Sequence, residues 1–239
     1  MHNLGYTRSA VRRDHILQTA DTFVRAPLPG MRNATAIVHV APAAGAAFTQ
    51  YTAEFAENGF LPPSGAQRFL YVLDGEVEVD GHSLGRDEYA YVPAGHPAGV
   101  CSNGAARAAV IEKAYTSLPG VAPPRFFSGR ESSLAPMPLD GDDWLHVRRL
   151  VPDDPAFDFA VNTMVYQPGA SLAMVEIHVM EHGLLMLDGG GIYRLGDSWY
   201  PVTAGDFIWM APYCPQWFAA VGKTPAKYLI YKDWNRPPL

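Results

Sequence analysis

The sequence lacks the features that mark disulfide-rich, zinc-ribbon, membrane and exported proteins. Its only two cysteines, Cys101 and Cys214, are isolated and form no CxxC pair, so neither a disulfide framework nor a zinc ribbon is indicated. No apolar run approaches the roughly 18 residues of a membrane-spanning helix. The first residues, MHNLGYTRSAVRRDH, lack the apolar stretch of an export signal. We therefore expect a cytoplasmic protein with no membrane partner.

Clustered positive charge is also missing. The formal net charge is -6 and the pI is near 5.7, and lysine and arginine gather nowhere along the chain. This argues against nucleic-acid partners and leaves small neutral or anionic molecules as substrates. Hydrophobic residues make up 48% of the 239 residues, which is ample for a sizeable core.

Convincing helical periodicity is absent, and short alternating segments lie between scattered glycines and prolines. Alternating segments separated by glycine and proline are typical of many short strands joined by turns. The segment 115–143, rich in proline, glycine and serine, is expected to be a crossing linker. The predicted strands form two groups, 36–40, 48–55, 68–72, 76–79 and 89–92, and then 159–166, 184–187, 191–195, 207–210 and 228–231.

The two groups of predicted strands resemble each other. RFLYVLDG at 68–75 matches HGLLMLDG at 182–189, and DEYAYVP at 87–93 aligns with GDFIWMA at 205–211. An internal duplication of an all-β unit is the simplest explanation. Antiparallel strands in two facing sheets would form a small barrel whose mouth can hold a ligand.

One stretch, MVEIHVMEHGLLMLDG at 174–189, combines metal-ligand residue types. Glu176 and His178 would share one face of a strand, and His182 follows four residues later. A lone histidine on a strand is usually a hydrogen-bonded core residue, but three such groups together favour a single divalent metal ion.

The same test applied to the first half gives a different result. When the two halves are aligned on Gly75 and Gly189, the residues that correspond to Glu176, His178 and His182 are Pro62, Ser64 and Arg68. The residue that corresponds to Gln216 in the alignment of 87–93 with 205–211 is Ala98. None of these can form the same site, so the first barrel is predicted to be metal-free.

Further residues complete a family resemblance. The turns PAGHP at 93–97 and APYCP at 211–215, the spacing Glu176-x-His178-x3-His182 and the following Gln216 are similar to the two motifs of the cupin domain. With the GIY segment at 191–193 and the tail YLIYKDWNR at 228–236, the chain resembles the (S)-ureidoglycine aminohydrolases over nearly its whole length.

This resemblance implies an all-β bicupin fold of two tandem antiparallel β-barrels, each a double-stranded β-helix or jelly roll. Residues 1–130 would form the metal-free N-terminal barrel, and residues 131–239 would form the C-terminal barrel with the metal site. Bicupins commonly assemble, so a homo-oligomer is expected.

The resemblance also implies an activity, the hydrolytic release of ammonia from (S)-ureidoglycine to give (S)-ureidoglycolate, in purine and allantoin breakdown. One Mn²⁺ per chain would be bound by Glu176, His178, His182 and Gln216, a thiolate-free donor set that suits manganese. Glu176 and Lys232 would be catalytic. Substrate binding would involve Lys232 and Gln216 together with Tyr193 and Tyr228.

Three other functions remain open. A quercetinase-like metal-dependent oxygenase would normally use a three-histidine site, which Gln216 in place of histidine disfavours. A non-catalytic ligand-binding or storage bicupin would need no intact metal site, and a small-molecule isomerase would differ only in its products. Four other histidines, His39, His82, His96 and His146, are expected on surfaces or loops.

Overall fold

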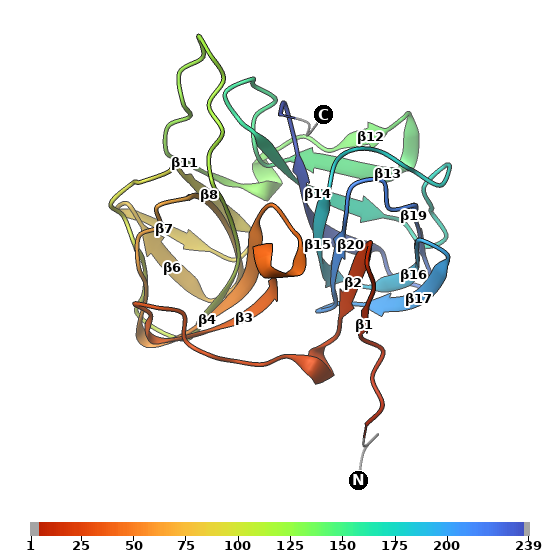
Figure 1. The fold of residues 1–239 in the computed structure, drawn as a ribbon, viewed down its shortest axis with the longest axis horizontal. Coiled ribbons are helices and arrows are strands. Elements are labelled where there is room, and N and C mark those ends of the chain that lie inside the picture. The colour runs from red at the N-terminus through yellow and green to blue at the C-terminus, as the bar shows by residue number, and fades with distance from the viewer. Residues whose placement is uncertain (1–4, 237–239) are drawn as a thin grey trace. The chain divides into compact units, whose positions relative to one another are not determined.

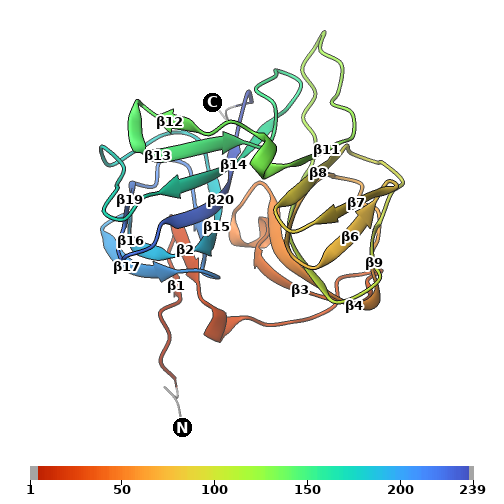
Figure 2. The same ribbon diagram turned by 180° about the vertical axis from the view of Figure 1, so that it is seen from behind.

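The computed structural model describes residues 5–236, which form β-strands and three short 3-10 helices (Figures 1 and 2). The predicted all-β fold is confirmed. No helix in this part of the chain is long and apolar enough to cross a membrane.

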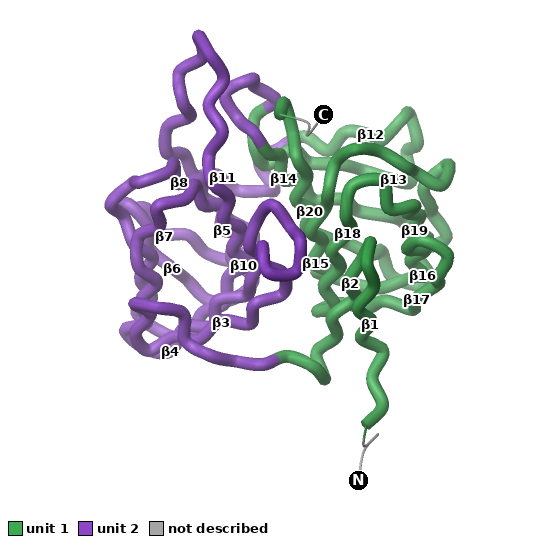
Figure 3. The backbone as a smooth tube through the Cα atoms, in the orientation of Figure 1, with its two compact units in different colours: residues 1–23, 135–152, 159–239 green, residues 24–134, 153–158 purple. Residues whose placement is uncertain are grey.

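The chain divides into two compact units, which Figure 3 distinguishes by colour. Unit 2 contains Val24–Leu134 and Asp153–Asp158. Its main sheet has the order β11-β8-β5-β10-β4-β9-β6-β7, with β3 paired to β4. The strands are β3 (Arg32–Val40), β4 (Thr49–Leu61), β5 (Gln67–Asp74), β6 (Glu76–Val79), β7 (His82–Gly85), β8 (Glu88–Val92), β9 (Val100–Ser102), β10 (Ala106–Lys113) and β11 (Phe127–Arg130).

Unit 1 contains the chain before Val24, Ala135–Pro152 and the chain from Phe159 onward. One sheet has the order β1-β2-β18-β15-β20-β14-β13-β12 and a second the order β17-β16-β19. The strands are β1 (Ala10–Val11), β2 (His15–Gln18), β12 (Met137–Leu139), β13 (Asp142–Arg149), β14 (Phe159–Tyr166), β15 (His182–Asp188), β16 (Gly190–Leu195), β17 (Ser198–Thr203), β18 (Phe207–Met210), β19 (Gln216–Ala220) and β20 (Ala226–Asp233).

This division differs from the expected domains 1–130 and 131–239 in two places. The chain before Val24 belongs to the C-terminal barrel, and the loop 153–158 belongs to the N-terminal barrel. The strand β2 belongs to the C-terminal barrel because it pairs with the edge strand β18, with Ile16 opposite Trp209. The buried Asp158 of the loop 153–158 accepts hydrogen bonds from Nε2 of Gln67 and from the backbone N–H of Thr116.

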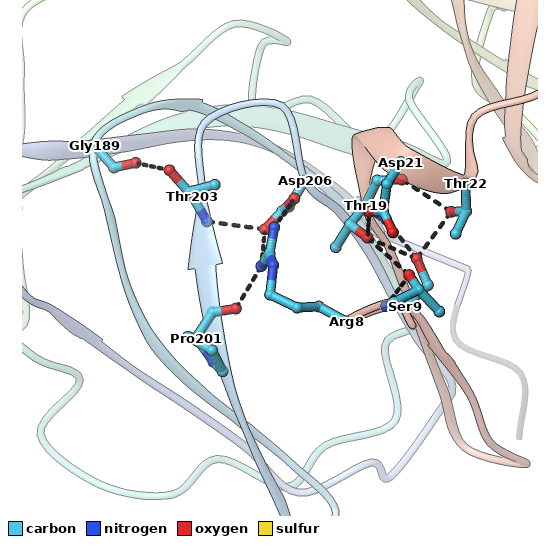
Figure 4. Close-up of polar contacts among 10 residues, drawn as sticks. Arg8, Ser9, Thr19, Asp21, Thr22, Gly189, Pro201, Thr203 and Asp206 are labelled. Carbon is cyan, nitrogen blue, oxygen red and sulfur yellow. Dashed lines mark hydrogen bonds and ion pairs between the residues drawn. The ribbon is translucent and has the colours of Figure 1, made fainter. Parts of the chain in front are cut away.

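Figure 4 shows the hydrogen bonds and the ion pair that hold the N-terminal segment within unit 1. The guanidinium of Arg8 donates two hydrogen bonds to the buried carboxylate of Asp206, at 2.8 and 3.0 Å, and another to the carbonyl of Pro201. The hydroxyl of Ser9 lies 2.8 Å from both Thr19 Oγ1 and Thr22 Oγ1. A bidentate pair of this kind fixes geometry as well as adding energy.

The expected linker 115–143 contains short structured elements as well as irregular chain. Its β11 pairs with the edge strand β8, and β12 pairs with β13. The carboxylate of Glu131 accepts a hydrogen bond from the hydroxyl of Tyr71, which fixes the chain just after β11. Edge strands of this length take their stability from such partners, and the local sequence gives little sign of them.

The two Asp-Gly turns that marked the duplication have the same conformation. Gly75 and Gly189 have φ values of 71° and 64°, the left-handed region that favours glycine. A Cβ at either glycine would lie 2.3 Å from the carbonyl oxygen of Ala105 or 2.4 Å from that of Pro225. Both turns therefore require glycine for conformation and for space.

His39 is not on the surface, contrary to the expectation above. His39 lies at a register shift between Val38 and Val40 of β3, and it is 6% exposed, on the same alternating face as the buried Ile37. Its Nε2 lies 2.9 Å from the hydroxyl of Thr52. Burial lowers the pKa of His39 to about 3.

Replacing His39 should change how stability depends on pH. In the unfolded chain this histidine binds a proton near pH 6.5, whereas in the folded chain it stays neutral down to about pH 3. The histidine therefore weakens folding as the pH falls below 6.5, by up to about 1.4 kcal/mol per pH unit. We expect His39→Gln to flatten the pH dependence of the urea midpoint between pH 6.5 and 4 in chelator-treated protein. The exposed His82→Gln serves as control, and equal slopes for His39→Gln and wild type would contradict the prediction.

Candidate metal centre and substrate cavity

Unit 1 encloses a cavity of about 260 Å³. Its walls come from β12, β13, β14, β15, β16, β19 and β20 and from the segment before β15. The lining residues are Met137, Pro138, Leu139, Val147, Arg149, Asn162, Met164, Leu172, Glu176, His178, Met180, His182, Tyr193, Gln216, Tyr228, Ile230 and Lys232. All seven residues predicted for the site lie on this cavity.

The pairing of β15 with β20 places several of these side chains. His182 is opposite Lys232, and Met186 is opposite Tyr228 four residues further along. Because alternate residues of a strand point to the same face, Tyr228, Ile230 and Lys232 all line the cavity.

The segment that carries Glu176 and His178 is not the strand that its alternation predicted. Its β-bridges to β19 are isolated ones, Ser171 with Ala219 and Glu176 with Gln216. The two bridges are five residues apart on this segment, from Ser171 to Glu176, but only three apart on β19, from Gln216 to Ala219. A continuous ladder of paired residues therefore cannot form between them. The backbones of Glu176 and Gln216 exchange two hydrogen bonds of 2.9 and 3.0 Å, and this exchange holds the two side chains together.

The four predicted ligand residues gather around Nε2 of His178. Nε2 of His178 lies 3.2 Å from Nε2 of His182, 2.8 Å from Nε2 of Gln216 and 3.8 Å from a carboxylate oxygen of Glu176. Nε2 of Gln216 is also 3.5 Å from that carboxylate. His182 and Gln216 are buried, while His178 and Glu176 are partly exposed toward the opening.

This arrangement fits a divalent metal ion. In an octahedral centre with bonds of about 2.1 Å, neighbouring ligand atoms are about 3 Å apart, close to the separation of the two imidazole nitrogens. Burial lowers the pKa of His182 to about 3, with further lowering by His178 and Lys232, so its imidazole is neutral and its lone pair is available near neutral pH. Carboxamide oxygen and nitrogen are interchangeable by rotation, so Gln216 can present its oxygen.

Two tyrosines, Tyr193 and Tyr228, form the inner wall beside this centre, and Tyr166 contacts Tyr228. The hydroxyls of Tyr166 and Tyr228 are 2.7 Å apart, and Tyr193 packs against the ring of Phe218. Burial raises the pKa of all three phenols well above the usual value, so they remain protonated hydrogen-bond donors. Lys232 is a half-buried residue of the cavity wall, with Nζ 4.4 Å from the centre of the Trp234 ring.

Two polar residues of the cavity were missed in the sequence, Arg149 and Asn162. They are direct neighbours on β13 and β14. Arg149 is exposed at the surface end, whereas Asn162 is buried. An asparagine within the otherwise mostly apolar strand FAVNTMVY was the available signal for Asn162. Nothing in the sequence distinguished Arg149 from other charged residues.

The N-terminal barrel, unit 2, has an ion pair at the position that corresponds to His182 and Lys232. Arg68 on β5 is opposite Glu112 on β10, as His182 is opposite Lys232. The guanidinium of Arg68 lies 2.6 Å from the carboxylate of Glu112, and Tyr51 donates a hydrogen bond to the same carboxylate. The metal-free state of this barrel stays a prediction.

A second cluster of metal-ligand types, which the sequence did not indicate, lies beside β2. Ligand atoms of Asp14, His15 and Cys214 are all within 4.8 Å of one another. However, Nδ1 of His15 is 2.9 Å from Asp14 and Nε2 is 3.0 Å from the hydroxyl of Tyr200, so both ring nitrogens are already hydrogen-bonded. This cluster holds the N-terminal strand to the barrel.

Comparison with known proteins identifies the fold and the family. A cupin domain model matches residues 162–231, and together with the two β-barrel units this makes the chain a two-domain cupin. The chain is 42% identical to "Probable (S)-ureidoglycine aminohydrolase" of Oryza sativa subsp. japonica, with 98% of the chain and 78% of that protein covered. It is 41% identical to (S)-ureidoglycine aminohydrolase of Arabidopsis thaliana, with 98% and 80% covered.

A solved structure agrees with these relatives. The crystal structure of protein Ylba from E. coli matches with a TM-score of 0.86 and 29% identity, covering 99% of this chain and 98% of that one. The chain belongs to the (S)-ureidoglycine aminohydrolase family. The family expected from the sequence is thus confirmed.

Removing either imidazole should release the metal. We expect His178→Ala and His182→Ala to weaken binding of a divalent ion by on the order of 100-fold or more, since loss of even an outer partner of a metal ligand costs about 10–100-fold. Metal retained after loading and gel filtration, measured by plasma mass spectrometry, checks this. His146→Ala, on β13 of the same barrel, should retain the wild-type content. Full retention in both cavity variants would exclude these histidines as ligands.

Proposed function

We propose that the chain is a manganese-dependent (S)-ureidoglycine aminohydrolase that acts in the cavity of the C-terminal barrel. The observation that carries this proposal is the convergence of Glu176, His178, His182 and Gln216 on the cavity of a chain from this family. The substrate is a small ureide, which suits a cavity of about 260 Å³.

Manganese is the proposed ion because the four side chains offer one carboxylate, two imidazoles and one amide oxygen, and no thiolate. When bound, the ion would supply Lewis acidity and a fixed point for orienting the substrate. His182, buried and neutral, and Gln216, held by its backbone exchange with Glu176, would keep the centre in place.

The opening and the inner wall would hold opposite ends of the substrate. Lys232 is half-buried beside the centre, where its ammonium would pair with the substrate carboxylate in a charge-assisted contact. The protonated hydroxyls of Tyr193 and Tyr228 would donate hydrogen bonds from the inner wall. This fixed placement would select one configuration at the reacting carbon.

In the proposed reaction, water forms a C–O bond at the carbon that carries the amino group, and the C–N bond to that group breaks. The carboxylate of Glu176 takes one proton from the water and returns one to the departing nitrogen, which leaves as ammonia. The product is (S)-ureidoglycolate, and the enzyme ends in its starting protonation state. Glu176 is partly exposed at the cavity, where it can reach both groups.

Three general expectations continue as part of the proposal. The enzyme would act in the cytoplasm, bind neither nucleic acid nor membrane, and form a homo-oligomer. Exposed apolar side chains support assembly, since contiguous exposed apolar surface commonly marks protein interfaces. Met174, Val175 and Ile177 are such residues on the segment that carries Glu176.

The activity is tested by loading the protein with Mn²⁺, supplying freshly generated (S)-ureidoglycine and comparing ammonia release with the spontaneous rate. We expect a clear acceleration in wild type and a loss of at least about 100-fold in Glu176→Ala, because a general base contributes about 10²–10⁴-fold. Glu57→Ala, an exposed residue of the other unit, is the control. An unchanged enzymatic rate in Glu176→Ala would reject the mechanism.

Lys232→Ala should separate substrate binding from metal binding. If the ammonium pairs with the substrate carboxylate, its removal should raise KM by about 10-fold or more, since hydrogen bonds to charged groups contribute roughly 1.5–3 kcal/mol. Metal content should stay at the wild-type level. Loss of the metal together with activity would instead assign Lys232 to the stability of the centre.

A further inference from the structure

Asn162 is a buried polar side chain that the proposed mechanism does not use. It lies on β14 and lines the cavity, with 7% of its surface exposed. No hydrogen bond joins its carboxamide to another side chain within residues 5–236, and its place on the cavity wall leaves it accessible to a ligand. Buried amides are nearly always paired, because burial without a partner is unfavourable, so this group is available for a ligand.

The sheet register places Asn162 between groups already assigned to the substrate. Asn162 is opposite Ile230 on β20. Lys232 is two residues further along that strand and Tyr228 two residues back, and all three of these residues of β20 line the cavity. Diagonal neighbours on adjacent strands are within reach of one ligand. A molecule held by Lys232 can therefore also touch the carboxamide of Asn162.

The chemistry of the carboxamide differs from that of its neighbours. Lys232 only donates hydrogen bonds and suits a carboxylate, whereas an asparagine offers one acceptor oxygen and two donor hydrogens. A ureido group presents the matching set, a carbonyl acceptor and N–H donors, in one plane. Among the residues that line the cavity, Asn162 is the carboxamide outside the proposed metal ligands, and it offers an acceptor oxygen and two N–H donors in one plane without a charge.

We infer that Asn162 binds the ureido group of the substrate and is a specificity-determining residue of this site. The inference rests on the proposed function and adds to it the means by which the cavity distinguishes a ureide from a simple hydroxy acid. A site built to pair with such a group discriminates strongly against ligands that lack it, because its polar side chain is then left unpaired.

The test compares two ligands on metal-loaded protein by calorimetry, (S)-ureidoglycolate and glycolate, which lacks the ureido group. We expect Asn162→Ala and Asn162→Leu to weaken (S)-ureidoglycolate binding by about 10-fold or more, the cost of losing one or two hydrogen bonds. Glycolate binding should change by less than about 2-fold, so the selectivity ratio falls. Asn162→Asp, which keeps the acceptor and loses the donor, should also lose selectivity.

Met164→Leu is the matched control, because Met164 lies on the same strand and lines the same cavity without a strong hydrogen-bonding group. It should leave the selectivity ratio unchanged. Metal content and thermal unfolding of each variant establish that the centre and the fold are intact. If one Asn162 variant fails to fold, the remaining ones decide the result.

The outcomes separate the two proposals. If wild type hydrolyses (S)-ureidoglycine but the Asn162 variants keep their preference for the ureido ligand, or lose both ligands equally, the role of Asn162 is rejected and the proposed function stands. If wild type neither hydrolyses (S)-ureidoglycine nor prefers (S)-ureidoglycolate, the proposed function is rejected and the role of Asn162 with it.

Discussion

The antiparallel register of β15 with β20 is the constraint on which the site depends. It places His182 opposite Lys232 and fixes which residues of β20 face the cavity. A slip of one residue would turn every one of these side chains to the other face. The Asp188-Gly189 turn, whose glycine has no room for a Cβ, ends β15 at a defined residue and so helps to set this register.

The same register in the other barrel holds different chemistry. There the pair is Arg68 and Glu112, two charges that neutralise each other and share the hydroxyl of Tyr51. In the C-terminal barrel the corresponding pair is a neutral imidazole and an ammonium, which do not neutralise each other. The same scaffold position thus holds an ion pair in one barrel and a predicted metal ligand beside a cation in the other. This difference is why a duplicated fold is proposed to carry one site.

Much of the site could be predicted because the informative residues are close in sequence. Glu176, His178 and His182 lie within seven residues, and the duplication supplied Gln216. The irregular path of the segment 173–181 was missed because alternation of side chains survives without a continuous ladder. Arg149 and Asn162 were missed because a cavity wall joins strands that are distant in the chain.

Two errors in the fold have related causes. The pairing of β2 with β18 joins residues nearly 200 positions apart, and a short strand of four residues carries no mark of its partner. His39 is buried, as are Ile37 and Val40 beside it, because this part of β3 is covered on both faces, which its own sequence does not reveal. Local patterns therefore identified the elements well, while long-range partners and local irregularities needed the structure.

The placement of β2 also has a consequence for how the molecule is made. All of unit 2 lies between Val24 and Asp158, whereas the barrel with the cavity needs strands from both before and after that stretch. During synthesis on the ribosome, the first barrel can close as soon as Asp158 has emerged. The cavity barrel must wait for β20, near the end of the chain, so the early strand β2 stays without its partner β18 through most of translation.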